Sequence, residues 1–371
     1  MFPTSPGRSR LRFPAMLLAG LTLLVALWLG FVRLGWRVPI AHPALLIAHG
    51  PLMVSGFLGT LISVERAVAL GWRPAYLIPL LSGLSALVAI VGPTSPAGAL
   101  LAVLSSAGLV AISALIARRQ PALHTVSMAL GAASWLAGNT LRLAGWPIHQ
   151  IVVWWVGFLV LTIAGERLEL SRVLRPGRAS QAAFGLAAGL YLVGSVASLF
   201  APDTGYRVAG AGLVATAIWM LRHDIARRTV RKVGLTRFIA ACLLSGYAWL
   251  LVGGVLWIGY GPQVAGLLYD AMLHAVFLGF VFAVIFGHAP IILPAVLGAE
   301  IDYRPLFYAH LALLNASLVL RVGGDLLRWL PGRLWGGPLN IVALLLFLLL
   351  TAAAFRRAPR PGPAWDQQDE T

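Results

Sequence analysis

Eight histidines carry most of the chemistry that this 371-residue sequence could perform. All but His223 lie within or at the ends of long apolar stretches, where an imidazole is costly unless it is paired or faces a cavity. Near one end of these stretches lie His42, His49, His149 and His274. Near the other end lie His124, His288 and His310. Histidine is the commonest metal ligand, so the first group is a candidate metal site, although each ring alone could equally hydrogen-bond between helices.

Two pairs of these histidines share a helical face if their segments are regular α-helices. His42 and His49 are seven residues apart, which is two turns and about 10 Å along the axis. His274 and His288 are fourteen apart, about 21 Å, the spacing at which one helix of a cytochrome b ligates two stacked haems. Any metal must bind through His, Met, Tyr or carboxylate groups, because Cys242 is the only cysteine.

The apolar stretches themselves define the fold class. Hydrophobic residues make up 59% of the chain, charged residues 11%, and the mean hydropathy is +0.86, which is typical of a membrane protein. Runs of about 20 apolar residues suffice to span a bilayer as a helix, and these runs are continuous, unlike barrel strands. We therefore expect an all-α polytopic protein of about twelve transmembrane helices. The predicted spans are 14–32, 43–62, 75–92, 97–117, 122–143, 147–165, 181–200, 205–221, 238–259, 263–289, 304–321 and 338–355.

Positive charge predicts the orientation of these spans. Of the 28 Lys and Arg residues, 21 fall on one side when alternate loops are counted, and this side is expected to be cytoplasmic. Both tails, 1–13 and 356–371, then lie in the cytoplasm, on either side of a single membrane domain, 14–355. The net charge of +16 is accounted for by membrane boundaries and anionic lipid headgroups, so it does not indicate nucleic acid as a partner.

An internal repeat recurs every four predicted spans. The copies are Gly56-Phe57-Leu58, Gly157-Phe158-Leu159 and Gly279-Phe280-Val281. Nine residues after the glycine come Glu65, Glu166 and His288. The repeat predicts three four-helix units around a pseudo-threefold axis, a 4+4+4 arrangement.

The charged groups in and near the spans can be interpreted as hydrogen-bond partners, ion pairs or headgroup-level charges. Asp270 lies one turn before His274 and could accept its ring N–H, or it could pair with Arg142; both alternatives stay open. The Glu-Arg pairs that begin at Glu65 and Glu166 fall at helix ends, where we interpret them as charges at the level of the lipid headgroups.

One segment resembles a known haem-binding motif. Ala48-His49-Gly50-Pro51-Leu52-Met53-Val54 is similar to the His-Gly-x-x-Met motif in the second helix of subunit I of the haem-copper oxygen reductases. The resemblance implies twelve spans and a low-spin haem b bound through His49, within a motif that includes Met53. The opposite axial ligand in that family comes from the tenth helix, where His274 lies in this sequence.

The sequence also departs from that family. Val276 stands where the high-spin haem ligand is expected, Val153 replaces the tyrosine that follows the copper-binding histidine, and the range 181–200 has no histidine. The usual binuclear centre is therefore not expected. Leu273-His274-Ala275 and Gly287-His288 resemble instead the NnrS family, twelve-span haem- and copper-containing proteins associated with nitric oxide.

These resemblances imply a multi-pass protein of the bacterial inner membrane that binds haem b. It would work in electron transfer or nitrogen-oxide metabolism, as an oxidoreductase if it is an enzyme, with a membrane or periplasmic electron donor. Copper is expected near His149 and His42, with a third ligand from Met53, Tyr269 or Asp270. The alternative is a permease whose histidines line a substrate or proton path.

Overall fold

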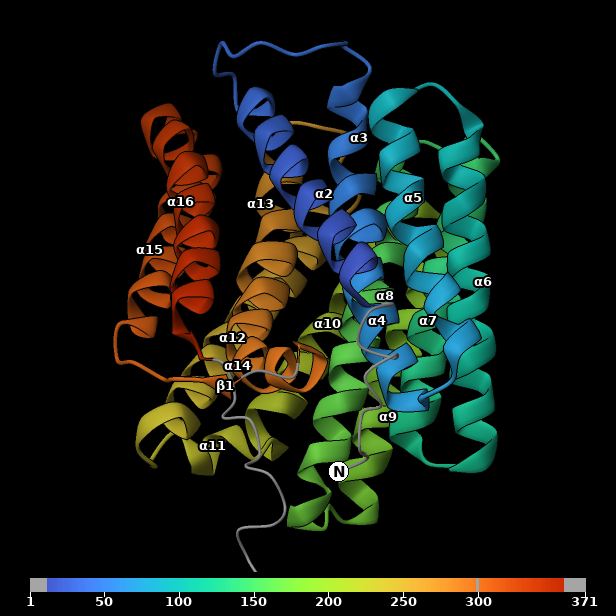
Figure 1. Ribbon diagram of the computed structural model, residues 1–371, viewed down its shortest axis with the longest axis vertical. Coiled ribbons are helices and arrows are strands. Elements are labelled where there is room, and N and C mark those ends of the chain that lie inside the picture. The colour runs from blue at the N-terminus through green and yellow to red at the C-terminus, as the bar shows by residue number, and fades with distance from the viewer. Residues whose placement is uncertain (1–11, 298–299, 357–371) are drawn as a thin grey trace, which may run out of the picture.

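The computed structural model describes residues 12–297 and 300–356, most of which are helical (Figure 1). Apolar runs adopt helices because, in hydrocarbon, backbone N–H and C=O groups must pair within their own segment. The elements of the first half are α2 (Arg12–Arg33), α3 (Leu45–Pro51), η1 (Leu52–Gly59), α4 (Thr60–Leu70), η2 (Arg73–Tyr76), α5 (Leu77–Val91), α6 (Pro96–Arg119), α7 (Leu123–Leu143), α8 (Ile148–Leu170) and η3 (Ser171–Leu174).

The second half continues the helical pattern. Its elements are α9 (Arg178–Ala197), α10 (Pro202–His223), α11 (Ala226–Thr229), α12 (Gly234–Tyr260), α13 (Leu267–His274), η4 (Ala275–Phe282), α14 (Ala283–Leu297), β1 (Glu300–Ile301), α15 (Phe307–Leu326), α16 (Leu330–Ala354) and β2 (Phe355–Arg356). The two short strands pair antiparallel, with Glu300 opposite Arg356. Since α3, η1 and α4 are continuous, as are α13, η4 and α14, we call them the α3–α4 helix and the α13–α14 helix.

The all-α fold class is confirmed, and every predicted span coincides with a helix. Within the described part of the chain, nine helices are long and apolar enough to cross a membrane. The other three long helices, α7, α10 and α15, fall short because polar residues such as Asn139, Asp203 and Asn315 lower their hydropathy. The predicted tails lie outside the described residues, except that α2 already begins at Arg12 and β2 ends at Arg356.

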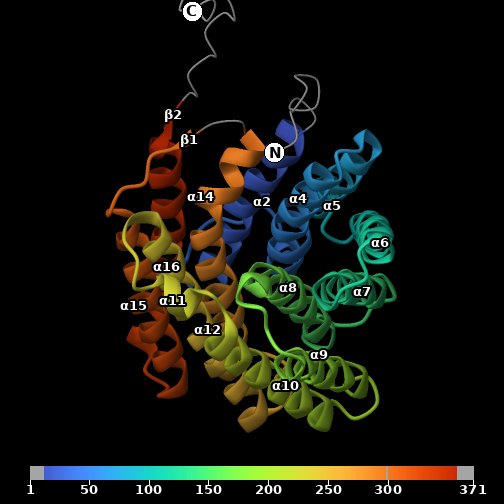
Figure 2. The same cartoon turned by 90° about the horizontal axis from the view of Figure 1, so that it is seen from below.

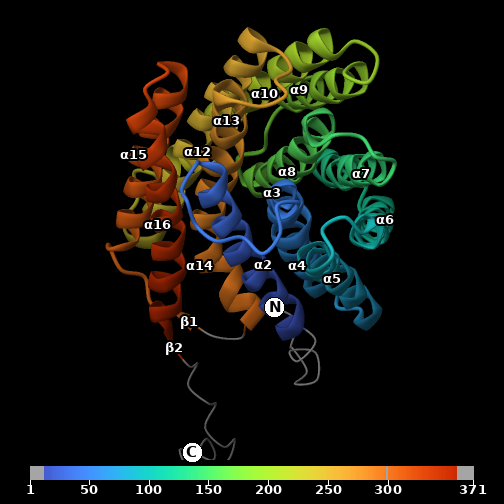
Figure 3. The ribbon, with the colours of Figure 1, turned by 90° about the horizontal axis from the view of Figure 1, so that it is seen from above.

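The helices pack side by side as a bundle. Viewed end on, α15 and α16 lie at one side, α5, α6 and α7 at the other, and α2, α8 and the α13–α14 helix between them (Figures 2 and 3). The loop 34–44 crosses the end of the bundle opposite to α11 and β1 (Figure 1).

The three helices that carry the sequence repeat are the most buried of the apolar helices. The buried share of the most apolar window is 83% in α8, 67% in the α13–α14 helix and 61% in the α3–α4 helix, against 33–56% in the other six. The repeated glycines lie where helices cross closely. A Cβ on Gly56 would lie 2.6 Å from Ala86 Cβ, and one on Gly279 would lie 2.4 Å from Trp249 Cγ. The repeat therefore corresponds to the central helices of the bundle.

Two of these central helices share an irregularity that the sequence did not reveal. Each contains eight residues of π-helix, and the repeated glycine, Gly56 or Gly279, is the fifth residue of that segment in both. Pro51, which lacks a backbone N–H, lies directly before the first segment. A π-helical segment bonds i to i+5 and so changes which residues share a face. Face arguments based on 3.6 residues per turn do not hold across η1 and η4.

Candidate functional site

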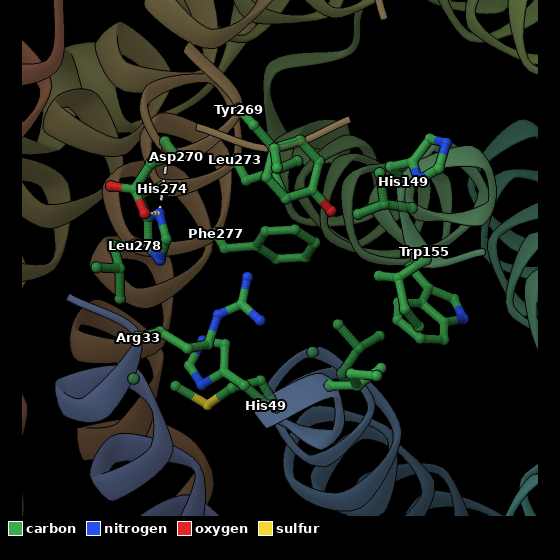
Figure 4. A pocket seen from close by; sticks show the side chains of 18 of the residues that line it. Arg33, His49, His149, Trp155, Tyr269, Asp270, Leu273, His274, Phe277 and Leu278 are labelled. Atoms are coloured by element: carbon green, nitrogen blue, oxygen red, sulfur yellow. Dashed lines mark hydrogen bonds and ion pairs between the residues drawn. The ribbon is translucent and has the colours of Figure 1, made fainter. Parts of the chain in front are cut away.

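A cavity of about 720 Å³ opens between α2, the α3–α4 helix, the turn from α7 to α8, the α13–α14 helix and α16. Six of the eight residues that the sequence singled out line its wall: His49, Met53, Arg142, His149, Asp270 and His274. The other two, His42 and His288, lie elsewhere. Residues far apart in sequence thus converge on one site. In Figure 4, Asp270 and His274 lie on one side of it and His149 and Trp155 on the other.

His49 is held against α2. Its Nδ1 lies 2.8 Å from the carbonyl oxygen of Ala26, and because a carbonyl can only accept, Nδ1 carries the proton and donates it. A Cβ on Gly30 would lie 3.1 Å from the His49 ring, a contact so tight that the imidazole would have to shift, so glycine at this point of α2 leaves the ring its place. The Nε2 atom is then unprotonated and free to bind a ligand from the cavity.

His274 is oriented in the same way from the other side of the cavity (Figure 4). Its Nδ1 lies 2.8 Å from the Asp270 carbonyl oxygen one turn earlier and 3.3 Å from the Asp270 carboxylate. Such hydrogen bonds from the second ring nitrogen fix the tautomer and orientation of metal-binding histidines. Both imidazoles therefore offer Nε2 to the same space.

The Asp270 carboxylate is bound by an arginine that the sequence analysis did not consider. Arg321 of α15 donates to it twice, Nε to Oδ2 at 2.7 Å and Nη2 to Oδ1 at 2.8 Å. Asn340 of α16 lies 3.5 Å from the same guanidinium and donates to Ser317 at 2.6 Å. Of the two partners predicted for Asp270, His274 is present, while Arg142 lies on the cavity wall and makes no contact with the carboxylate.

The cavity wall carries more positive than negative charge. Four arginines line it, against the single carboxylate of Asp270. Arg321 pairs with Asp270, and Arg333 lies 3.3 Å from the buried Asp325. Among the described residues, Arg33 and Arg142 have no carboxylate partner, although Arg33 donates to the Leu46 carbonyl at 2.9 Å. The site is suited to a ligand that carries negative charge.

The remainder of the wall is apolar. Leu58, Phe277 and Phe282 line it, and Phe282 stacks on Phe57 with ring centroids 5.9 Å apart. The loop residues that line the cavity, around Pro147 and Gly266, belong to the end of the bundle opposite to α11. The cavity is thus bounded by polar groups near that end and by aromatic packing deeper in the bundle.

Of the residues predicted to bind copper, Met53, His149, Tyr269 and Asp270 line the cavity, whereas His42 lies outside it. His42 precedes α3, which begins only at Leu45, so the expected helical stripe with His49 is wrong; His42 is exposed and its Nδ1 accepts the Ala44 N–H. The His149 ring points away from His49 and His274 (Figure 4). Within residues 12–297 and 300–356, no cluster of three or more His, Cys, Asp or Glu residues could hold a metal ion.

His288 lies at the far end of the α13–α14 helix, outside the cavity. Its Nδ1 donates to the Val284 carbonyl at 2.9 Å, and its closest charged neighbours include Arg167 and Glu65. Because η4 intervenes, the regular four-turn spacing from His274 does not apply. None of its charged neighbours is a histidine that could act with His288 as a second ligand pair.

The Glu-Arg pairs at these helix ends form ion pairs within the protein, which their interpretation as headgroup-level charges did not include. Arg66 donates to Glu65 at 3.4 Å and more closely to Glu166 on α8, and all three side chains are at most one-third exposed. Arg167 binds the fully buried Asp224 at 2.7 and 3.0 Å. These ion pairs connect neighbouring helices, because burial makes an unpaired charge too costly.

The fold and the site define a helical membrane protein with a cationic cavity and two oriented imidazoles. Its family follows from the sequence as a whole. The chain belongs to the family described as Domain of unknown function (DUF8744), whose model matches residues 12–356. Neither a curated protein nor a solved structure matches the chain.

Removing the Arg321 guanidinium tests the network behind His274. Arg321→Gln leaves the largely buried Asp270 carboxylate without its main partner, so we expect a loss of about 3 kcal/mol in the free energy of unfolding. The matched control is Arg207→Gln, which breaks an exposed Arg–Asp pair that solvent screens, so we expect little change in stability. Unfolding in mixed detergent micelles, followed by circular dichroism, measures both; equal losses would contradict the assignment.

Proposed function

We propose that the protein is a haem b-binding membrane protein of electron transfer or nitrogen-oxide metabolism, with the haem iron held between His49 and His274. One observation carries this proposal. Two imidazoles from different central helices line one cavity, and a backbone carbonyl holds the Nδ1 of each, so that both Nε2 atoms are available. Such a pair of imidazoles would be able to hold a low-spin haem.

The rest of the cavity fits this group. Its volume of about 720 Å³ is within the range of cofactor sites, and its deeper wall of Leu58, Phe277 and Phe282 suits a large apolar ring. Arg33, whose guanidinium lies near His49 in Figure 4, supplies a cation for a haem propionate. Bound haem would supply one-electron chemistry, while the protein provides orientation, charge and exclusion of water.

Asp270 acts as a positioning residue in this proposal. Its carbonyl and carboxylate both contact His274 Nδ1, and Arg321 fixes the carboxylate in turn. An imidazole that donates to a carboxylate is a more basic ligand through its other nitrogen. The network therefore orients the His274 ring and would make it a stronger ligand for a bound iron.

The proposal includes twelve transmembrane spans in a 4+4+4 arrangement and a bacterial inner-membrane location with both tails in the cytoplasm. Helices at all twelve predicted ranges and the central position of the three repeat-bearing helices support it. A divergent relation to the NnrS-like and haem-copper reductase proteins fits the His-Gly-x-x-Met segment. The two oriented imidazoles support the haem part of that relation. For copper, the described residues contain no cluster of three or more His, Cys, Asp or Glu side chains.

The permease alternative receives less support. A transport path would continue from the cavity to the opposite end of the bundle, but aromatic side chains pack below it, including the stacked pair Phe57–Phe282 and the fully buried Phe280. The charged groups at the inner end are occupied in ion pairs such as Arg167–Asp224. Three histidines, His49, His149 and His274, line this one cavity.

Single substitutions of the two ligands test the haem assignment. Purified His49→Gly and His274→Gly variants should each contain at least about tenfold less haem than wild type, since one axial bond is lost, and external imidazole should restore part of it. The control is His42→Gly, an exposed histidine outside the cavity. Reduced-minus-oxidised optical spectra provide the measurement. A Soret band unchanged in both ligand variants would refute the site.

Reporter fusions test the topology. A fusion after Lys232, in the basic segment that follows α11, and one after Thr371 should both report a cytoplasmic location, because positive residues concentrate on that side. A fusion after Gly145, in the turn between α7 and α8, should report the opposite side. Opposite locations for Lys232 and Thr371 would contradict the twelve-span arrangement.

A further inference from the structure

A second group of polar side chains lines the same cavity away from the two oriented histidines. We call it the outer lobe and define it by Arg142, Trp146, His149 and Tyr269. Arg142, Trp146 and His149 lie at the end of α7, in the following turn and at the start of α8. Tyr269 comes from α13, and its hydroxyl points across the cavity toward α8 in Figure 4. The lobe is thus formed by two walls that face each other.

The polar groups of the outer lobe are not used by the protein itself. The Arg142 guanidinium makes no ion pair or hydrogen bond with any described residue, and the same holds for the hydroxyl of Tyr269. Both residues are partly buried. A guanidinium withdrawn from bulk water without a counter-charge is unfavourable, and its electrostatic attraction for an anion increases as the effective dielectric falls. The lobe is therefore incomplete without an anionic partner.

The hydrogen-bonding groups of the outer lobe determine which kind of ligand it can bind. A guanidinium and an indole N–H only donate hydrogen bonds, and a tyrosine hydroxyl donates readily. A planar oxyanion accepts several such bonds at once and matches the fork of an arginine. A metal cation would instead be repelled by Arg142, so the predicted copper position next to His149 is better suited to a negative ion.

The two cavity arginines without a carboxylate partner, Arg33 and Arg142, have different neighbours. Arg33 is an electrostatic neighbour of both His49 and His274, so it lies at the edge of the proposed haem. Arg142 is not among the charged neighbours of either ring. One arginine is thus assigned to a haem propionate, while the other remains for a separate ligand.

We propose that the outer lobe binds a small planar oxyanion, with Arg142 as its counter-charge and Tyr269 donating from the facing wall. This inference rests on the proposed function insofar as a haem occupies the other side of the cavity. The anion would lie at the open end of the cavity. Nitrite serves as the probe because it is small, planar and singly charged.

Anion titration tests the proposal. Isothermal titration of the purified protein in nanodiscs of neutral phosphatidylcholine, with potassium nitrite at constant ionic strength, should give saturable binding. The Kd should rise at least tenfold in Arg142→Gln and severalfold in Tyr269→Phe. It should stay unchanged in the control Arg207→Gln, which removes an outer arginine away from the cavity. No saturable binding, or the same Kd in wild type and Arg142→Gln, would overturn the proposal.

Optical spectra of the same samples separate this inference from the haem assignment. A Soret band retained in Arg142→Gln together with weaker nitrite binding supports the outer lobe. A Soret band lost in Arg142→Gln would mean that Arg142 holds a haem propionate, which overturns it. A wild type that lacks haem but still binds nitrite through Arg142 would refute the proposed function and leave the anion site intact.

The lipid composition of the discs distinguishes a free ion from a headgroup phosphate, since both offer the same oxygens. Nitrite should bind with similar Kd in neutral discs and in discs that contain phosphatidylglycerol. Nitrite binding that disappears only in the anionic discs would assign the outer lobe to a lipid headgroup and overturn the free-ion proposal.

Discussion

Inside a bilayer, a charged side chain can find its partners only within the protein, and this constraint organises the site. The Asp270 carboxylate satisfies it by accepting two hydrogen bonds from Arg321 and by contacting His274 Nδ1. The pairing joins α13 to α15 and, through Asn340, to α16. The orientation of one imidazole thus depends on the packing of three helices.

The apolar pattern was sufficient to predict the helices and much of the cavity wall. Hydrocarbon leaves a chain of this composition few folds, so each predicted span has its helix. His49 and His274 could be placed in one site because intramembrane histidines at similar depth tend to face an interior space. Asp270 could be predicted from its i,i+4 spacing to His274. This spacing places the two side chains together because both residues lie in the regular helix α13.

Other features depend on three-dimensional packing that spacing does not encode. The π-segments η1 and η4 changed the helical faces beyond Gly56 and Gly279, so the inferred stripe from His274 to His288 failed. Arg321 lies 51 residues from Asp270, and only the rule that a buried arginine needs a carboxylate could have suggested the pair. Glu166 and Arg66 were assigned to the headgroup level because the sequence predicts only how deep a residue lies along its own helix. It does not predict that Arg66 of α4 faces Glu166 of α8.

The central claim is that His49 and His274 hold one low-spin haem b. Electron paramagnetic resonance of the oxidised wild-type protein, combined with near-infrared magnetic circular dichroism, tests it most directly because the spectra report the spin state and the chemical identity of both axial ligands. The account predicts a six-coordinate, low-spin ferric haem with two imidazole nitrogens. A high-spin spectrum, a ligand other than histidine on either face, or the absence of haem would contradict it.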